Sequence, residues 1–239
     1  FIQKVKNKFV SWCKEKKIIA EFLRLHPLIQ YENYYWGNII NNRKTVLINL
    51  ELDLMENYDA RRRTDVRSSY KNEYKIEKVD SKFMNDFFPN LYYENMKKIG
   101  ASDFYLFNKK YFNNLFQSKL VDNWLLFNKK EPVAGVVILI NENSKTVEYH
   151  LSARSNLRDK SMVFMIHKIS EFYKNKNYKS FFLGGGRTTS SKDSLLYFKK
   201  GFSPIEIDFN IGFCIYNKKK YNELKSLFNK DSNRILFYR

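Results

Sequence analysis

The stretch FFLGGGRTTSSKDSLLYFKKGF, residues 181–202, decides how the second half of this chain folds. Its hydrophobic run predicts a strand over 179–183, and its amphipathic segment predicts a helix over 191–200. Three consecutive glycines stand between them: Gly184, Gly185 and Gly186. Glycine lets the backbone turn sharply or approach a ligand without a side chain in the way. The glycines therefore mark either a ligand-binding turn or a tight strand-to-helix connection.

The residues after the glycines indicate where the helix begins. The expected capping residues are Ser190, Ser191 and Asp193. A ligand anion at this position would meet the positive end of the helix. The segment is neither a Walker A loop nor a dinucleotide fingerprint, because it contains no GK[ST] and no GxGxxG.

Length and composition predict a folded globular protein. The chain has 239 residues, of which 44% are hydrophobic, so it can bury a sizeable core as one large domain or one and a half. No apolar run approaches the roughly 18 residues of a membrane span, and no cleavable leader is visible, so we expect a soluble, cytoplasmic protein. Cys13 and Cys214 are far apart, and the three histidines are scattered. We therefore expect neither a disulfide framework nor a metal site.

The charge balance is strongly basic. Lysine and arginine number 43 against 25 acidic residues, which gives a formal net charge of +18. Such a balance suggests nucleic acid or small anionic ligands as partners. However, Lys, Asn, Ile, Phe and Tyr are used heavily along the whole chain, and most lysines fall on expected solvated helix faces. This pattern favours a solvated surface charge over a dedicated nucleic-acid-binding role. The phosphates of a small-molecule ligand or of tRNA remain compatible with the charge, and DNA is not expected as a partner.

Hydrophobic periodicity predicts a mixture of helices and strands. A meander of strands followed by strands interleaved with helices predicts an α/β or α+β domain built on one mixed sheet. The expected strands are 17–28, 45–52, 73–79, 120–128, 132–140, 145–152, 179–183 and a pair across 203–216. The expected helices are 2–13, 53–72, 81–98, 109–117, 160–176, 191–200 and 218–228.

The motif VEYHLSAR, 147–154, carries a candidate general base. Alternation along a strand puts Glu148 and His150 on one face and Tyr149 on the other. An imidazole there could accept the proton of an amine nucleophile, because its ordinary pKa lies near neutrality. The alternative is a histidine that only makes a structural hydrogen bond.

The motif YDARRRTDVRSSYK, 58–71, carries Arg63, Arg67 and Lys71 at a spacing of four residues, which predicts a cationic stripe on a helix. Arginine can grip a phosphate with two donors, so a diphosphate is a plausible target. A solvated basic face is the alternative.

The motif EFLRLHPL, 21–28, places Glu21, Arg24 and His26 at the end of an apolar strand. Charged groups that interrupt such a strand indicate either a cleft or a salt-bridged edge.

Taken together, YHLSAR, FFLGGG, KDSLLYFKKGFS, EFLRLHPL and RRRTDVRSSYK resemble the Fem-type aminoacyl and acyl transferases and their acetyltransferase-like relatives in surface-polysaccharide and peptidoglycan biosynthesis. These proteins belong to the GNAT superfamily. The resemblance implies a GNAT-like mixed, twisted sheet flanked by helices. It also implies the end of a first GNAT-like unit at 1–52, a basic connecting helix at 53–72 and a GNAT-like acyltransferase domain at 73–239.

The resemblance implies roles for particular residues. The expected catalytic residues are His150, with Glu21 and Glu148 in reserve. The expected cofactor-binding residues are Ser152, Ala153, Arg154, Arg158, Gly184, Gly185, Gly186, Ser194 and Tyr197. The expected substrate-binding residues are Arg24, Arg63, Arg67, Lys71, Tyr149, Asp193 and Lys199.

The resemblance further implies that the strands near 145–152 and 179–183 splay apart around an acyl-CoA thioester. The CoA pyrophosphate would rest on amides at the start of the following helix. Related CoA-dependent proteins carry a glycine-rich loop there, whereas this chain has ARSNLRDKSM, 153–162, without glycine. Arg154, Arg158 and Lys160 could hold phosphate by charge instead.

The donor is therefore expected to be acyl-CoA, most simply acetyl-CoA, with aminoacyl-tRNA as the alternative. The expected function is N-acyl transfer to an amine, such as an amino sugar linked to a nucleotide or lipid, in bacterial cell-envelope biosynthesis. A Fem-type transferase acting on a peptidoglycan precursor is the alternative enzyme. A non-catalytic protein that binds nucleic acid or a surface is the alternative of another class, and membrane contact is expected to be peripheral at most.

Overall fold

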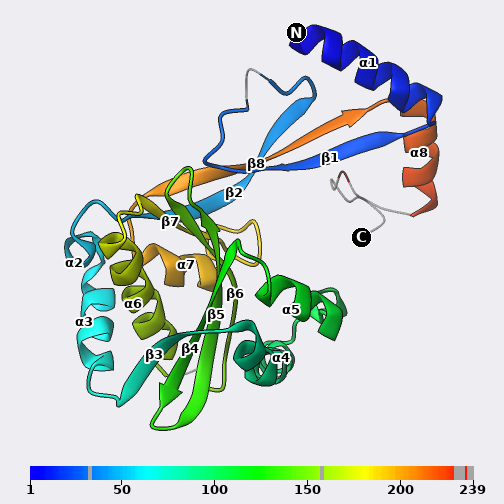
Figure 1. Cartoon of the computed structure of the whole chain (residues 1–239). Helices are drawn as coiled ribbons and strands as arrows, with labels where there is room; N and C mark the ends of the chain where they lie inside the picture. The colour runs from blue at the N-terminus through cyan, green and yellow to red at the C-terminus, as the bar shows by residue number, and fades with distance from the viewer. Residues whose placement is uncertain (32–33, 157–158, 229–234, 236–239) are drawn as a thin grey trace. The chain divides into compact units, whose positions relative to one another are not determined.

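The computed structural model describes residues 1–31, 34–156, 159–228 and 235 (Figure 1). It contains two compact units. One comprises 1–44 and 207–239, and the other comprises 45–206. The strands form one eight-stranded mixed sheet in the order β1-β8-β2-β7-β6-β5-β4-β3. This confirms the expected α/β sheet flanked by helices.

Most strands lie near their predicted positions, whereas β2 begins seven residues before the strand expected at 45–52 and ends three residues before its expected end. The strands are β1 (Ala20–Leu25), β2 (Asn38–Asn49), β3 (Tyr74–Val79), β4 (Val121–Asn128), β5 (Glu131–Asn141), β6 (Thr146–Arg154), β7 (Ser180–Gly185) and β8 (Glu206–Ile215). β3 to β6 pair as an antiparallel meander, and β6 pairs with β7 in parallel. The continuous hydrophobic runs of β4, β5 and β7, which are buried in the fold, account for the agreement there.

The helices also lie near their predicted positions. They are α1 (Ile2–Glu15), α2 (Leu54–Asn57), α3 (Ala60–Ser69), α4 (Ser81–Lys98), α5 (Lys109–Phe116), α6 (Ser161–Asn175), α7 (Ser194–Lys200) and α8 (Lys218–Leu227), with a 3₁₀ turn η1 at Asp103–Tyr105.

The single helix expected over 53–72 is wrong. Two acidic residues divide this segment, because each caps a helix of its own. Asp53 accepts a hydrogen bond from the amide of Glu56 at the start of α2, and Asp59 accepts one from the amide of Arg62 at the start of α3.

The pair of strands expected across 203–216 is also wrong, since this segment forms the single strand β8. β8 runs antiparallel to β1 from Ala20↔Ile215 to Leu25↔Asn210. Gly212 is not a turn residue there. A Cβ atom at Gly212 would lie 2.6 Å from the Tyr35 ring, so the glycine makes room for that ring.

The pairing of β8 with β1 explains why the C-terminal residues join the N-terminal residues in one compact unit. Within this unit Cys13 is fully buried, and the Tyr35 hydroxyl donates a hydrogen bond of 3.0 Å to Oε1 of Glu21. The expected division into a partial GNAT-like unit at 1–52, a connecting segment at 53–72 and a GNAT-like domain at 73–239 describes evolutionary relationship. The compact units do not test it, so it stays a prediction.

The unit 45–206 has a hydrophobic core on each face of its strands. α6 covers one face, where Met165, Ile169 and Phe181 are fully buried. α4 and α5 cover the other face, where Phe88 and Phe112 are fully buried (Figure 1). Full burial of side chains of this size stabilises a fold by about 1.5–3 kcal/mol each.

Candidate active site

The strands β6 and β7 diverge after a short parallel contact. Their pairing extends only from Thr146↔Ser180 to Glu148↔Phe182, although β6 continues to Arg154 and β7 to Gly185. Beyond this point β7 pairs with β2 on its other side, up to Thr45↔Gly185. Backbone groups of β6 and β7 that face each other beyond Glu148 and Phe182 therefore lack the pairing of a continuous sheet. This is the splay that the resemblance implied.

The glycine turn lies at the end of β7. Gly184 has φ = +73°, a conformation that residues with a side chain rarely adopt. At Gly186 a Cβ atom would lie 2.4 Å from Oδ1 of Asp193, so this glycine permits close packing of the turn on the next helix. The glycines thus form a tight strand-to-helix connection, and a ligand-binding role for them stays a prediction.

Asp193 caps α7, as one of the three expected capping residues. Its Oδ1 accepts hydrogen bonds from the amides of Leu195 and Leu196 at 2.9 and 3.0 Å. Its Oδ2 accepts from the amide and hydroxyl of Thr188 at 2.9 and 3.0 Å. Burial alone would raise the pKa of Asp193, but these donors outweigh it and lower the pKa to about 2. The carboxylate therefore occupies the two amides at which a ligand anion was expected.

Lys199 of α7 carries a buried amine at the divergence of β6 and β7. Only 7% of the residue is exposed, and its Nζ donates a hydrogen bond of 2.8 Å to the carbonyl oxygen of Gly185. Nζ also lies 5.7 Å from the centre of the Tyr149 ring, a cation–π contact. Burial lowers the pKa of Lys199 to about 8, although Asp193 acts in the opposite direction. The amine is thus a positive charge that a small change of pH removes.

Tyr149 forms part of the surroundings of this amine. It packs against the core beneath α6, with its ring near Phe181. Burial raises the pKa of Tyr149 to about 12, while Ser152 and Arg154 lower it in part. Tyr149 therefore stays neutral near pH 7 and presents a ring face to Lys199.

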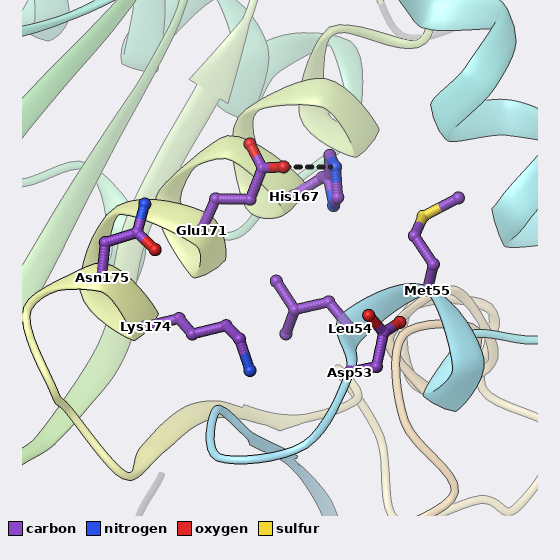
Figure 2. A pocket seen from close by; sticks show the side chains of 7 residues that line it. All are labelled: Asp53, Leu54, Met55, His167, Glu171, Lys174 and Asn175. Carbon is purple, nitrogen blue, oxygen red and sulfur yellow. Dashed lines mark ion pairs between the residues drawn. The ribbon is translucent and has the colours of Figure 1, made fainter.

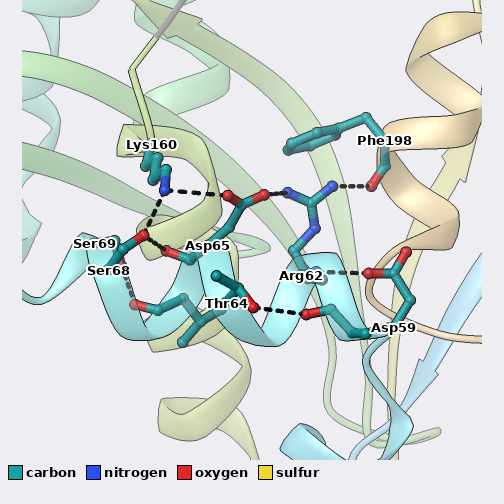
Figure 3. Close-up of polar contacts among 10 residues, drawn as sticks. Asp59, Arg62, Thr64, Asp65, Ser68, Ser69, Lys160 and Phe198 are labelled. Atoms are coloured by element: carbon teal, nitrogen blue, oxygen red, sulfur yellow. Dashed lines mark hydrogen bonds and ion pairs between the residues drawn. The ribbon is translucent and has the colours of Figure 1, made fainter.

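Arg62 holds α7 in place, as Figure 3 shows. Its Nη2 donates a hydrogen bond of 3.0 Å to the carbonyl oxygen of Phe198, and its Nη1 lies 3.3 Å from Oδ2 of Asp65. The guanidinium carbon lies 4.5 Å from the centre of the Phe198 ring and 4.6 Å from that of Phe202. Sequence reasoning missed Arg62, because its partners on and beside α7, Phe198 and Phe202, lie more than a hundred positions later in the chain.

The predicted cationic stripe is only partly present. Arg63 donates to the carbonyl oxygen of Tyr58, and Arg67 is exposed on α3. Lys71 lies beyond the end of α3 at Ser69, so the three side chains do not line one helix. Phosphate binding by these residues stays a prediction.

His150 lies at a bulge in β6. The register with β5 shifts there, since Val137 pairs with Leu151 and Ile138 with Tyr149. Nε2 of His150 lies 3.1 Å from the hydroxyl of Tyr111 on α5. Desolvation by the surrounding protein lowers the pKa of His150, and Glu148 partly offsets this.

The contact with α5 places His150 on the face that α4 and α5 cover. Lys199 contacts Tyr149, which packs on the opposite face. The expected base and the buried lysine are therefore on different faces of the sheet. Catalysis by His150 or Glu148 stays a prediction.

The first amide of α6, that of Ser161, already has a partner. Oδ1 of Asp159 accepts hydrogen bonds from the amide of Ser161 at 3.1 Å and from its hydroxyl at 2.5 Å. Nζ of Lys160 lies 2.5 Å from the Ser68 hydroxyl and 3.2 Å from Asp65 on α3 (Figure 3). The expected phosphate-binding charge of Lys160 is instead part of the contact between α3 and α6.

Five other residues expected to bind the cofactor lie in β6 or in α7. Ser152 and Ala153 pair with β5, and the amide of Arg154 donates to Asn95. Ser194 accepts a long hydrogen bond from Arg187, and Tyr197 is largely exposed. Arg158 lies outside the described residues.

Two further expected residues belong to the other compact unit. Glu21 lies in β1 and accepts the hydrogen bond from Tyr35, and Arg24 is exposed on the same strand. Their expected catalytic and substrate-binding roles stay predictions.

A separate hollow of about 320 Å³ lies beside α6, as Figure 2 shows. Its lining includes His167, whose Nε2 lies 3.3 Å from Oε1 of Glu171. Lys174 donates to the carbonyl oxygens of Leu50 and Leu52. Lys174 thus fastens α6 to the segment before α2, and the pair of His167 and Glu171 lies within α6 itself, so we assign these polar groups to the fold.

The described residues include neither a group suited to a metal ion nor a membrane-spanning helix. Within 1–31, 34–156, 159–228 and 235, no three His, Cys, Asp or Glu side chains are grouped so that they could hold a metal ion. Nor is any helix in these ranges long and apolar enough to cross a membrane.

A mixed sheet that diverges at one parallel pair, with helices on both faces, is the fold of the GNAT-like transferases. No protein-family model matches the chain, and no curated protein matches it in sequence. Solved structures do match. The C-terminal domain of a protein assigned as a lysylphosphatidylglycerol synthetase, from Agrobacterium fabrum, is 14% identical with a TM-score of 0.68, and the match covers 92% of this chain and 74% of that one.

Two other similar structures agree with this assignment of the fold. L-PGS from Bacillus licheniformis is 14% identical with a TM-score of 0.67, covering 90% of this chain and 73% of that one. FemX is 15% identical with a TM-score of 0.59, covering 90% and 70%. At these identities the matches establish the fold, and the expected resemblance to Fem-type, GNAT-like proteins is confirmed at that level.

Proposed function

We propose that this chain is an acyl-group transferase whose reacting carbonyl lies where β6 and β7 diverge. The observation that carries the proposal is the buried amine of Lys199, hydrogen-bonded to a neutral carbonyl at that place. Burying a charged amine costs free energy unless a partner compensates for it. A lysine in such a position is suited to a ligand that develops negative charge.

The proposed reaction is attack of an acceptor amine on an activated ester. A carbon–nitrogen bond forms, the ester carbon–oxygen bond breaks, and the leaving oxygen gains the proton that the amine loses. The carbonyl oxygen becomes negative in the tetrahedral intermediate. The Lys199 ammonium would stabilise that oxygen, and removing one such donor commonly lowers kcat by about 10²–10³.

The start of α6 favours aminoacyl-tRNA over acyl-CoA as the donor. A CoA pyrophosphate would rest on amides there, whereas Asp159 already accepts from the amide of Ser161 and its carboxylate would repel a pyrophosphate. The net charge of +18 suits a polyanion such as tRNA. The names of two structures with the same fold, lysylphosphatidylglycerol synthetase and FemX, agree with aminoacyl transfer. Acetyl transfer from acetyl-CoA is the second candidate.

The proposed acceptor is an amine on a peptidoglycan precursor or on a sugar linked to a nucleotide or lipid, as the cell-envelope resemblance suggests. The experiment supplies both donors in turn. Bulk tRNA charged with radiolabelled amino acids, or radiolabelled acetyl-CoA, is incubated with the protein and a mixture of such precursors. Label in alkali-stable linkage to an acceptor is then separated by chromatography.

We expect label to pass from tRNA in the wild type and to fall by about 10²-fold in Lys199→Met. Transfer from acetyl-CoA would instead support the second candidate. No transfer from either donor, with salt-dependent binding of tRNA, would support the non-catalytic alternative. Lys192→Met, which removes an exposed lysine near the same helix, is the matched control and should transfer at the wild-type rate.

A further inference from the structure

Three consecutive large apolar side chains lie exposed between α4 and α5. The exposed fractions are 63% for Phe104, 49% for Tyr105 and 38% for Leu106. We call these three residues the tip. An isolated exposed apolar residue is ordinary on a protein surface, whereas a contiguous group marks a site of interaction.

The tip is held outward by an ordered base. The next residue, Phe107, turns inward and stacks on Tyr111 at 4.3 Å and on Tyr92 at 5.9 Å between ring centres. The Tyr93 hydroxyl donates to the carbonyl oxygen of Phe107. The backbone of the tip closes the η1 turn. The chain thus anchors one aromatic residue and presents the three before it.

Lysines flank the tip on both sides. Lys97 ends α4 together with Lys98, and Lys109 and Lys110 begin α5, all four with exposed side chains. Nζ of Lys98 donates to the carbonyl oxygen of Ser155 at 2.8 Å, so Lys97, Lys109 and Lys110 are the lysines that the proposal uses. The dipole of a helix disfavours positive charge in its first turn. Lys109 and Lys110 therefore do not stabilise α5. Binding of an anionic surface would explain why two lysines stand at this position.

We propose that the tip and its flanking lysines bind the surface of an anionic lipid membrane. Aromatic and aliphatic side chains enter the boundary between headgroups and acyl chains, and adjacent lysines pair with lipid phosphates. RNA fits the tip less well. The Phe104 and Tyr105 rings are nearly perpendicular, at 88°, so they offer no shared stacking platform, and Leu106 has no ring to stack.

This inference goes beyond the proposed transferase reaction, because membrane binding needs no turnover. It is tested by sedimentation of the whole chain with vesicles of phosphatidylcholine alone and of an equal mixture with phosphatidylglycerol. We expect binding to the mixed vesicles only. Phe104→Ala with Leu106→Ala should lower the partition coefficient at least about tenfold, because the lost apolar area no longer leaves water.

Reversing the charge of two flanking lysines provides a second, independent test. Lys109→Glu with Lys110→Glu should lower the partition coefficient by about fivefold or more for each charge. Acidic residues suit the first turn of a helix, so this variant should fold as well as the wild type. Lys119→Glu with Lys130→Glu makes the same change of net charge at exposed positions away from the tip, and Leu52→Ala removes an exposed apolar side chain beside two acidic residues.

Both control variants should bind mixed vesicles nearly as the wild type does. The proposal is overturned if the tip variants keep wild-type binding, or if the controls lose as much as they do. It is also overturned if the tip variants lose affinity for tRNA, measured in parallel, while vesicle binding stays unchanged, because the surface would then be an RNA site.

Discussion

Nη2 of Arg62 donates a hydrogen bond of 3.0 Å to the carbonyl oxygen of Phe198, the residue directly before Lys199. Through this bond a buried guanidinium on α3 fixes the helix that carries the proposed catalytic amine. Asp65 and the rings of Phe198 and Phe202 complete its surroundings. The position of Lys199 thus depends on a contact between two helices far apart in the sequence.

Arg62→Ala is expected to destabilise the fold by about 3 kcal/mol, because it leaves the Phe198 carbonyl without its buried donor and Asp65 with Lys160 alone. Chemical denaturation measures this change. Arg61→Ala removes an exposed arginine from the same helix and should change the free energy of unfolding by less than about 0.5 kcal/mol. Equal effects of the two substitutions would contradict the assigned role of Arg62.

Gly186→Ala is expected to destabilise the fold by about 1–3 kcal/mol, since the new Cβ would lie 2.4 Å from Oδ1 of Asp193. The destabilisation by this clash should depend on the side chain of Asp193, which caps α7. In an Asp193→Ala background the same glycine substitution should therefore cost less. Additive effects in this double-mutant cycle would mean that packing on Asp193 is not the reason for the glycine.

His150→Ala is expected to lower kcat by less than about tenfold, because His150 contacts Tyr111 on the face opposite Lys199. A general base usually contributes about 10²–10⁴-fold. Transfer kinetics of His150→Ala and Tyr111→Phe decide this. If His150→Ala instead lost 10²-fold or more and Tyr111→Phe did not, His150 would act as the base that the sequence suggested.

Lys199→Met should change stability in a pH-dependent way. The pKa of Lys199 in the folded state, about 8, is below the ordinary value of about 10.4 in an unfolded chain. Between these values the unfolded state binds more protons, so the wild type gains stability as pH rises. Relative to Lys199→Met, its free energy of unfolding should therefore increase from about pH 8 to pH 10, measured by urea denaturation. A constant difference would contradict the lowered pKa.

Sequence patterns predicted most of the secondary structure because hydrophobic periodicity is local. The runs at 81–98 and 121–128 appear as α4 and β4 almost residue for residue. The break between α2 and α3 was missed although its signal was present, since Asp53 and Asp59 each stand where a helix cap would. The single strand β8 was harder to recognise, because Asn210 and Gly212 within it are residue types that favour turns, and the Tyr35 ring that explains the glycine is distant in sequence.

The site was less predictable, because its properties arise from contacts distant in sequence. The resemblance named Lys199 as a substrate-binding residue. Its lowered pKa depends on burial in the folded chain, which outweighs the opposite effect of Asp193. Arg62 gave no local sign of its role, since Phe198 and Phe202 surround it only in the fold. The bulge at His150 was likewise invisible, because it is defined by the register with β5.

The most direct test of the central claim is the pH dependence of single-turnover transfer by the wild type and by Lys199→Arg. If the Lys199 ammonium stabilises the developing oxyanion, the wild-type rate falls as pH rises through about 8, where the amine loses its proton. Arginine stays charged throughout this range, so the variant, whatever its absolute rate, should show no fall there. The same inflection in both proteins, or a wild-type rate that rises through pH 8, would contradict the claim.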